Sequence, residues 1–472
     1  MKTFQDLEVA QDKMAFVLQA INEHKGSELY QNAVIGMDYY RGENTTIVNY
    51  ERMINTITGQ KVRDKYSANH KVTSKFFKKF VTQQTQFLLG NGVTWENEAD
   101  FGDHFDIDLQ KAAKNALIGA VSFGFWNLDH MDVFKITEFV PLMDENTGAL
   151  RAGIRFWQIS SNKPLRATLY EEDGYTEYAW NRREGNEKLQ GEVLKEKQAY
   201  ITNISISEID GIEIMEGENY PSFPIVPLWA NEERESELTG IREGIDAYDL
   251  IKNGFANDLD SAQLYWIIKG AGGMDDTDLV QFLDRLKLTH AAAPMDGQDV
   301  EAQTISIPYE ARNVLLDRIE RDLYRDYMAL NTDDLSSKNA TATEIKAAYE
   351  PLNAKADEFE YQILTFLDAI MKIAGVEDTP SFTRSYIVNT QEDVQTVLQA
   401  AQYLTDDYVT EKILTLLGDG DKAEEMIAQK QADSMARFNE DDETDGEDDA
   451  AAGEIAGMGE DIAGMLDDLL KE

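Results

Sequence analysis

One stretch in the second half of the chain repeats apolar residues in alternating steps of four and three. Its members are Ile345, Tyr349, Leu352, Ala356, Phe359, Ile363, Phe366, Ile370 and Ile373. A period of 3.5 residues held over about eight turns is typical of a long helix that packs on other helices along its whole length. Thr341 and Glu344 form a capping box where this helix is expected to begin, and Pro351 is expected to kink it. The helix packs either within the chain, as in a bundle, or between subunits.

The charge balance limits the partners of the protein. Its 44 Lys and Arg residues stand against 88 Asp and Glu residues, a net charge of −44. Residues 439–472 hold 14 acids and one lysine, so residues 1–438 still carry −31. Such a chain is not a conventional basic nucleic-acid binder, because a negative surface repels phosphate. A protein that handles DNA without binding it tightly is not excluded.

Cysteine is absent from the chain, which excludes disulfides, thiolate nucleophiles and cysteine-ligated metal centres. The first 16 residues contain no apolar signal core. The longest nearly apolar run, residues 116–126, is far shorter than the ~20 residues of a membrane helix. We therefore expect a soluble protein that neither carries a standard secretion signal nor spans a membrane.

The first 130 residues are predicted to be helical. A helix over 69–89 ends at the stop signal Gly90-Asn-Gly92. The one basic cluster of the chain lies here: Lys61, Arg63, Lys65, Lys71, Lys75, Lys78 and Lys79. It is either a solvated face that balances local acids or a contact with phosphate or an acidic partner.

Residues 132–227 are expected to form several antiparallel strands. The short runs 154–159, 167–170, 175–180 and 200–206 are rich in aromatic and β-branched residues, and glycine-containing breakers separate them. Three prolines, Pro221, Pro224 and Pro227, are expected to end regular structure.

A succession of helices follows. Residues 241–262 present one apolar face, and a compact module with strand-like 265–268, a helix over 276–289 and strand-like 303–307 comes next. Pro308 opens a second helix through Leu330, and a polar loop precedes the long helix. After a strand-like 381–388 come helices over 391–404, 406–417 and 422–438, and residues 439–472 form an acidic tail predicted to be disordered.

Catalytic signatures are absent from the sequence. It contains no G-x-x-x-x-G-K-[ST], H-E-x-x-H, G-x-S-x-G or G-x-G-x-x-G, and its five histidines are scattered. An acidic stretch from Asp441 mimics the start of a calcium loop, but Ala452 stands where the bidentate Glu belongs. We expect no enzyme, no cofactor and no metal site. A divalent-metal nuclease or hydrolase among the many carboxylates stays open as an alternative, because carboxylate spacing alone does not exclude it.

The order of these parts resembles the bacteriophage portal proteins of long-tailed phages that infect Gram-positive hosts. The resemblance rests on short strings in a fixed order over roughly 30–438. They are Tyr39-Tyr-Arg-Gly-Glu43, Asn69-His-Lys with Gln86-Phe-Leu-Leu-Gly90, Phe223-Pro-Ile-Val-Pro-Leu-Trp229, Leu238 with Ile245-Asp-Ala-Tyr248, Ser381-Phe-Thr-Arg384 and Gly418-Asp-Gly-Asp421. The alternative among structural proteins is another acidic virion adaptor or scaffold protein.

The resemblance implies an α+β, mainly α, portal fold assembled as a homo-oligomeric ring of about twelve subunits around a channel. The implied parts are a wing over 1–234 with a β-rich insert at about 132–230, a stem of helices 235–263 and 307–330, a clip over 264–306, a tunnel loop over 331–342, a long kinked wing helix with its connection over 343–384, a crown over 385–438, and the acidic tail 439–472 outside the family pattern.

It also implies location and partners. The ring would occupy one vertex of the virion capsid after assembly in the host cytoplasm, as the head–tail connector for DNA packaging and ejection. Its partners would be terminase, the head completion or tail adaptor protein, the major capsid and scaffolding proteins, and double-stranded DNA that passes without sequence-specific binding. No membrane partner is expected.

Three groups of site residues follow. The tunnel loop would offer Ser337, Lys338 and Asn339 to DNA, and Lys338 is the only base between Asn331 and Thr343. The stem would be built on Ile245, Tyr248, Ile251, Phe255, Leu315, Ile319 and Leu323. Subunits would pack through Tyr349, Leu352, Phe359, Ile363 and Phe366 of the long helix.

Overall fold

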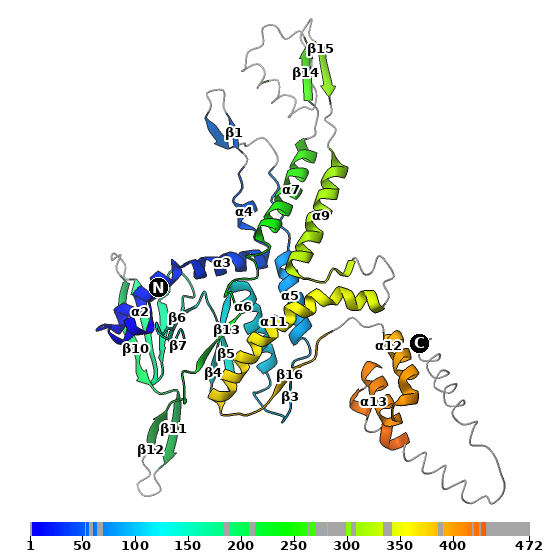
Figure 1. The fold of residues 1–472 in the computed structure, drawn as a ribbon. Coiled ribbons are helices and arrows are strands. Elements are labelled where there is room, and N and C mark those ends of the chain that lie inside the picture. Colours follow the sequence, from blue (N-terminus) through cyan, green and yellow to red (C-terminus); the bar gives the residue numbers. More distant parts are fainter. Residues whose placement is uncertain are drawn as a thin grey trace, which may run out of the picture. The chain divides into compact units, whose positions relative to one another are not determined.

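A computed structural model describes most of the chain in two separate units. The described residues are 2–51, 53–55, 60–63, 69–182, 189–206, 213–261, 265–269, 281, 299–303, 308–333, 342–385, 390–417, 420–423 and 426–430. The first unit runs from Met1 to Tyr386 and the second from Ile387 to Glu472 (Figure 1). The described residues combine helices with antiparallel sheets, which confirms the predicted α+β class.

Four helices open the first unit, and each begins at a residue whose side chain caps it. They are α1 (Phe4–Glu8), α2 (Lys13–Lys25), α3 (Glu28–Arg41) and α4 (Thr45–Val48). Their caps are Thr3, Asp12, Ser27 and Asn44, whose side-chain oxygens accept bonds from free backbone N–H groups of the first turn. Gly42 ends α3 in the left-handed conformation.

Helices α5 (Phe76–Leu89) and α6 (Phe105–Gly119) lie next to each other in the largest core. The prediction of a helix from residue 69 is wrong, because residues 69–75 are extended and bond to side chains of a distant helix. The prediction that the first 130 residues are wholly helical is also wrong, since strands β1 (Met53–Asn55), β2 (Lys61–Arg63), β3 (Val93–Trp95) and β4 (Val121–Asn127) lie among them.

Antiparallel strands dominate residues 132–227, as predicted, and β4 extends the strand-rich region back to Val121. A three-stranded sheet has the order β13-β4-β5, and a five-stranded sheet has the order β10-β9-β8-β7-β6. The new strands are β5 (His130–Lys135), β6 (Phe139–Met143), β7 (Leu150–Trp157), β8 (Leu165–Glu171), β9 (Gly174–Arg182), β10 (Leu189–Gln198) and β13 (Ile225–Trp229), and β11 (Ile201–Ile206) pairs with β12 (Glu213–Glu218).

Pro227 does not end regular structure, which corrects the prediction. It lies inside β13, opposite Phe123 of β4. Because β13 is an edge strand, a residue that cannot donate a ladder hydrogen bond is tolerated there. The edge strand β6 accommodates Pro141 in the same way.

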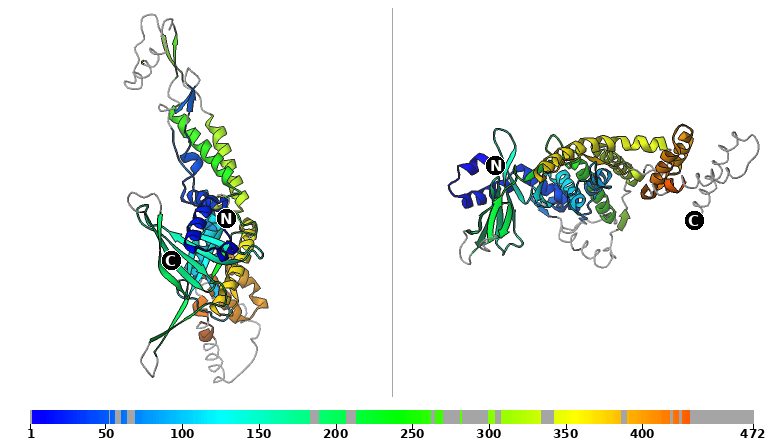
Figure 2. Two further views of the ribbon diagram at one scale, coloured as in Figure 1. Left: turned by 90° about the vertical axis from the view of Figure 1, so that its left-hand side faces the viewer. Right: turned by 90° about the horizontal axis from the view of Figure 1, so that it is seen from below.

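Two antiparallel helices stand on the body of the first unit. They are α7 (Arg242–Ser261) and α9 (Tyr309–Tyr327), and the hairpin of β14 (Tyr265–Lys269) and β15 (Asp299–Gln303) lies beyond their ends (Figures 1 and 2). The predicted strand at 265–268 and the helix that begins after Pro308 are confirmed. The second strand lies earlier than predicted, and the predicted helix at 276–289 falls almost entirely outside the described residues.

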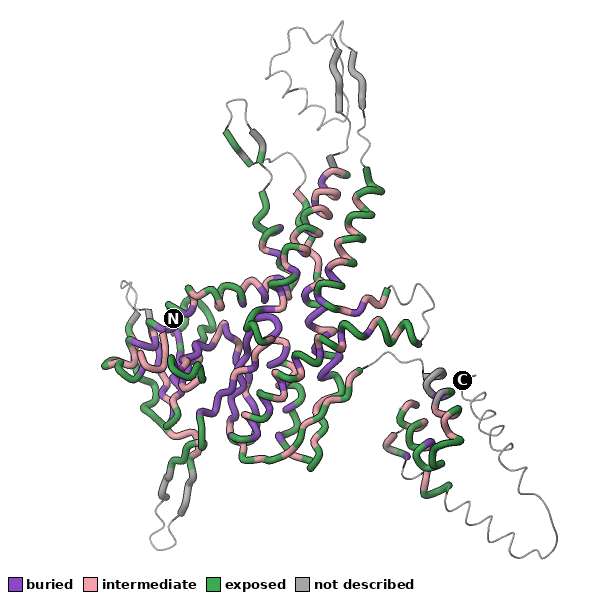
Figure 3. The backbone as a smooth tube through the Cα atoms, viewed as in Figure 1, coloured by how far each residue is buried: buried purple, intermediate pink, exposed green. Residues whose placement is uncertain are grey.

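The long helix α11 runs from Ala342 to Ala374 and continues through Pro351. The segment that follows α11 contains strand β16 (Pro380–Phe382), which pairs with β3. Buried residues trace the centre of the first unit along α6, β4 and α11 (Figure 3). In the second unit α12 (Thr390–Ala400) packs on α13 (Asp406–Leu417), whose limits are those predicted.

Candidate functional site: the α7–α9 helix pair and its anchorage

The helix pair α7–α9 is closely packed where it joins the body and less closely packed toward the β14–β15 hairpin. Near the body Ile245, Leu323 and Tyr327 are buried. Farther along the pair Leu315 is 44% exposed and Val314 is 65% exposed. The pair is therefore well packed at the end that joins the body and exposes apolar side chains farther from the body.

The structure places all seven predicted stem residues on these two helices. Ile245, Tyr248, Ile251 and Phe255 lie on α7, and Leu315, Ile319 and Leu323 lie on α9. Only Ile245 and Leu323 are fully buried. Tyr248 packs edge-to-face on Phe76 of α5, so the predicted apolar face contacts the body as well as its partner helix.

An extended segment, residues 69–75, runs antiparallel along α7, and we call it the strap. The backbone N–H groups of His70, Val72 and Ser74 donate to Asn257 Oδ1, Asn253 Oδ1 and Asp249 Oδ1 at 2.7, 2.7 and 2.9 Å. Two residues of extended chain advance about 6.6 Å, and four residues of helix advance about 6 Å. Every second residue of the strap therefore stays opposite every fourth residue of α7. The sequence does not reveal this contact, because its donors and acceptors are far apart in the chain.

Asp249 is a buried carboxylate at the lower end of this ladder. Besides the Ser74 N–H, it accepts a 2.9 Å hydrogen bond from Asn44 Nδ2. Burial raises the pKa of the Asp249 carboxyl, although these hydrogen bonds oppose the shift. One turn below, Asp246 accepts from the Tyr39 hydroxyl and from Thr46 Oγ1, so α7 is also tied to α3 and α4.

The end of α9 is anchored by a buried polar contact. The Tyr327 hydroxyl donates to Gln84 Oε1 of α5 at 2.7 Å, and burial raises the Tyr327 pKa well above its usual value. Lys355 of α11 lies 4.0 Å from the centre of the Tyr327 ring and forms a 2.5 Å ion pair with Glu237. Helices α5, α9 and α11 therefore meet at one point.

The basic cluster is distributed over the strap and its neighbours. Lys71 Nζ donates to the Val48 carbonyl, and Lys79 Nζ donates to the Tyr324 hydroxyl. Arg63 pairs with Glu51 at 3.2 Å, while Lys65 lies outside the described residues. Arg63 fits the first of the two alternatives, since it balances a local acid, whereas Lys71 and Lys79 bond to neutral oxygens of their own chain.

The five residues predicted to pack subunits together lie in the core of their own chain. Tyr349, Leu352, Phe359, Ile363 and Phe366 are each buried. They contact residues of α5, α6, α9 and the β4–β13 region. These side chains therefore have no surface to offer to a neighbour, and packing within the chain describes the apolar seam of α11.

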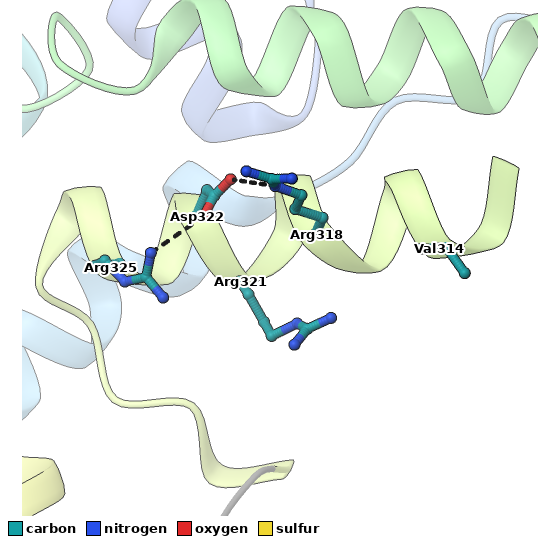
Figure 4. A pocket seen from close by; sticks show the side chains of 5 residues that line it. All are labelled: Val314, Arg318, Arg321, Asp322 and Arg325. Atoms are coloured by element: carbon teal, nitrogen blue, oxygen red, sulfur yellow. Dashed lines mark hydrogen bonds and ion pairs between the residues drawn. The ribbon is translucent and has the colours of Figure 1, made fainter. Parts of the chain in front are cut away.

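The outer face of α9 carries three arginines and one valine, which we call the arginine stripe: Val314, Arg318, Arg321 and Arg325. Arg321 and Arg325 lie two residues on either side of Leu323, about 200° around the helix, so the stripe faces away from α7. The four side chains and Asp322 line a hollow of about 320 Å³ (Figure 4). Asp322 lies 3.8 Å from Arg318 and 3.4 Å from Arg325.

A second hollow, the α7 groove, opens between α7 and α4. It measures about 210 Å³ and is lined by Ile47, Tyr50, His70, Leu250, Asn253, Gly254, Asn257 and Asp258. Tyr50 and Leu250 are both large and exposed. Glu243 continues the exposed face of α7 two turns nearer the body.

The remaining predicted site residues lie outside the described part of the chain. These are Ser337, Lys338 and Asn339. Within the described ranges, acidic and histidine side chains do not gather in groups of three that could hold a metal ion. The helices in those ranges include none long and apolar enough to cross a membrane.

Comparison with known proteins gives matches over most of the chain. The family model described as phage portal protein, SPP1 Gp6-like, matches residues 126–436. The portal protein of Bacillus phage SPP1 is 25% identical over 442 residues, which cover 83% of this chain and 81% of that protein. The portal protein of Clostridium phage phiCD119 is 29% identical over 198 residues, 40% of this chain and 44% of that protein. The chain thus spans under half the length of this second relative.

A solved structure from the virion of a native gene transfer agent particle also matches the chain. It is 10% identical, with a TM-score of 0.43, and the match covers 85% of this chain and 98% of that one.

Proposed function

The chain belongs to the SPP1 Gp6-like family of phage portal proteins, and on that premise we propose that it forms the ring at one vertex of a phage capsid through which DNA is packaged and ejected. The match over residues 126–436 carries this proposal. Family membership confirms the resemblance predicted from the sequence. The protein is accordingly a structural component of the virion, the head–tail connector.

The ring would contain about twelve subunits, and the helix pair α7–α9 would be its stem. Two features support this assignment: the pair stands on the body of the first unit, and its base is anchored at several points. Residues 264–306 would then be the clip that docks terminase and later the tail adaptor. Residues 1–234 with α11 would form the wing, and 385–438 the crown.

The acidity of the chain suits a passage for DNA. A net charge of −44 per subunit becomes on the order of −500 for twelve subunits. An acidic wall denies DNA the release of counterions that makes nucleic-acid binding tight, so the duplex can slide. Residues 331–342 would form the tunnel loop, where Lys338 would give a narrow cationic collar that touches phosphate transiently.

The other proposed partners are the major capsid and scaffolding proteins around the wing and crown. Assembly would take place in the host cytoplasm before the capsid fills. The basic cluster stays open as a contact for capsid, scaffold or DNA at Lys61, Lys65, Lys75 and Lys78, because Arg63, Lys71 and Lys79 bond to partners within the chain.

Native mass measurement and negative-stain imaging of the full-length protein test the proposal. We expect rings of about twelve subunits with a hole wide enough for duplex DNA. Ring assembly depends on concentration and salt, so both are varied. A chain that stays monomeric or dimeric across those conditions would overturn the proposal and return attention to the acidic adaptor and metal-dependent hydrolase alternatives.

A further inference from the structure

The arginine stripe stands out in a chain with twice as many acids as bases. The side chains of Arg318 and Arg325 are each 78% exposed. Both lie beside Asp322 at distances beyond a short ion pair, so most of their surface faces solvent in the single chain. A solvated row of three arginines with one exposed valine is a surface that fits an acidic partner with an apolar centre.

The α7 groove offers an apolar centre, and one exposed acid, Glu243, lies below it on the same helix. Tyr50 and Leu250 supply an apolar centre, and Gly254 leaves its floor open because a Cβ at this position would meet nothing within 4 Å. Glu243 lies on the same face of α7 nearer the body and is exposed. The stripe and the groove lie on different sides of the helix pair.

The two surfaces also match in height along the pair. Leu323 of α9 lies beside Gly244 of α7, and Arg312 forms a 2.5 Å ion pair with Asp258. Arg325 is therefore level with Glu243, and Val314 is level with Gly254. Val314 and Arg325 are eleven residues apart on α9, and Glu243 and Gly254 are eleven residues apart on α7, about 16 Å of helix in each case.

We infer that the arginine stripe of one subunit docks in the α7 groove of the next, with Arg325 beside Glu243 and Val314 against Leu250 and Gly254. This inference rests on the proposed ring, whose axis runs along the stem, because rotation about such an axis preserves height. The contact joins two different surfaces, so it repeats head to tail and closes into a ring. The Arg325–Glu243 pair fixes the register, and the apolar centre excludes water.

The absence of cysteine gives a direct test of proximity. Two single variants, Val314→Cys and Gly254→Cys, are mixed, allowed to assemble and oxidised. We expect covalent dimers that contain one chain of each kind, because a disulfide needs Cα atoms within about 7 Å. The matched control pairs Val314→Cys with Leu128→Cys, which is exposed on the body and is expected to give no such dimer.

A charge swap tests the pairing itself. Arg325→Glu and Glu243→Arg are each expected to shift ring formation to at least tenfold higher protein concentration, and the double variant is expected to recover most of the loss. Two outcomes would overturn the docking while leaving the proposed function intact. In the first, rings of normal size form but oxidation gives no mixed disulfide dimers. In the second, rings form but the double charge-swap variant assembles no better than the single variants. Intact rings of Arg325→Glu that lose only DNA would also overturn the docking and assign the stripe to phosphate. A wild-type chain that forms no ring would overturn both.

Discussion

The hydroxyl of Tyr327, in the last turn of α9, donates a 2.7 Å hydrogen bond to Gln84 Oε1 in the middle of α5, and both side chains are buried. The Tyr327 ring also carries Lys355 of α11 on its face. The base of the helix pair is therefore tied to two helices of the body by a polar contact that water does not reach. A movement of α9 against the body would have to break this contact.

Tyr327→Phe should lower the free energy of unfolding by about 1–3 kcal/mol, because it leaves the Gln84 carbonyl buried without its donor. Denaturant unfolding of the variant measures the change. The control is Tyr309→Phe at the other end of the same helix, where the hydroxyl reaches an exposed Glu310 at 3.3 Å. Equal effects of the two substitutions would contradict the special role of the buried pair.

Asp249→Asn should change the pH dependence of stability. Since burial raises the folded-state pKa of Asp249 above its ordinary value of about 3.8, the folded protein binds the proton more tightly than the unfolded chain. The stabilisation from this group is fully present below the ordinary pKa and is lost as pH rises through the folded pKa. Asparagine does not titrate, so this loss is absent in the variant.

Unfolding of the wild type and of Asp249→Asn is compared at a series of pH values from about 3 upward. The free energy of unfolding of the wild type should fall relative to that of Asp249→Asn as pH rises through the folded pKa of Asp249. The mismatch of the asparagine amide with Ser74 N–H and Asn44 Nδ2 adds a penalty that does not depend on pH. A difference that stays constant with pH would show that Asp249 is not shifted.

Two helical glycines should respond in opposite directions to the same change. A Cβ at Gly36 of α3 would overlap the Ile118 backbone carbonyl, whereas a Cβ at Gly254 of α7 meets open space. Gly36→Ala should therefore destabilise the subunit by about 1–3 kcal/mol through overpacking. Gly254→Ala should stabilise it by about 0.5–1 kcal/mol through the lower entropy of the unfolded chain. Thermal melts of the dissociated subunit check both signs.

The sequence predicts elements whose signals are local. The apolar face of α7, the start of α9 after Pro308 and the limits of α13 all depend on residues within a few turns of one another. The strap could not be predicted, because its backbone bonds are made to Asn253 and Asn257, which also suit a solvated helix face. Pro227 was misread for a related reason: its tolerance depends on β13 being an edge strand, a property of the whole sheet.

The apolar seam of α11 shows the same limit at the level of the site. Its period predicts a buried face but contains no information on which chain buries it. Phe359→Ala should cost about 3–5 kcal/mol of unfolding free energy in the dissociated subunit, since the ring is 1% exposed within its own chain. Tyr361→Ala, on the opposite face and 65% exposed, should change it by less than about 0.5 kcal/mol. Denaturant unfolding at low protein concentration compares them. A small loss for Phe359→Ala would return the seam to the subunit interface.

Lys338→Glu tests the proposed cationic collar of the channel. If Lys338 of each subunit touches phosphate, a ring of glutamates at the same place repels the duplex, and the filled capsid should retain several-fold less DNA. Rings should still form, because Lys338 is not among the residues of the subunit contact inferred from α7 and α9. The matched control is Lys346→Glu, which makes the same change of charge on the exposed face of α11. Packaging and retention are measured by nuclease protection of encapsidated DNA. Equal retention in the two variants would mean that total charge, not a collar at Lys338, governs passage through the channel.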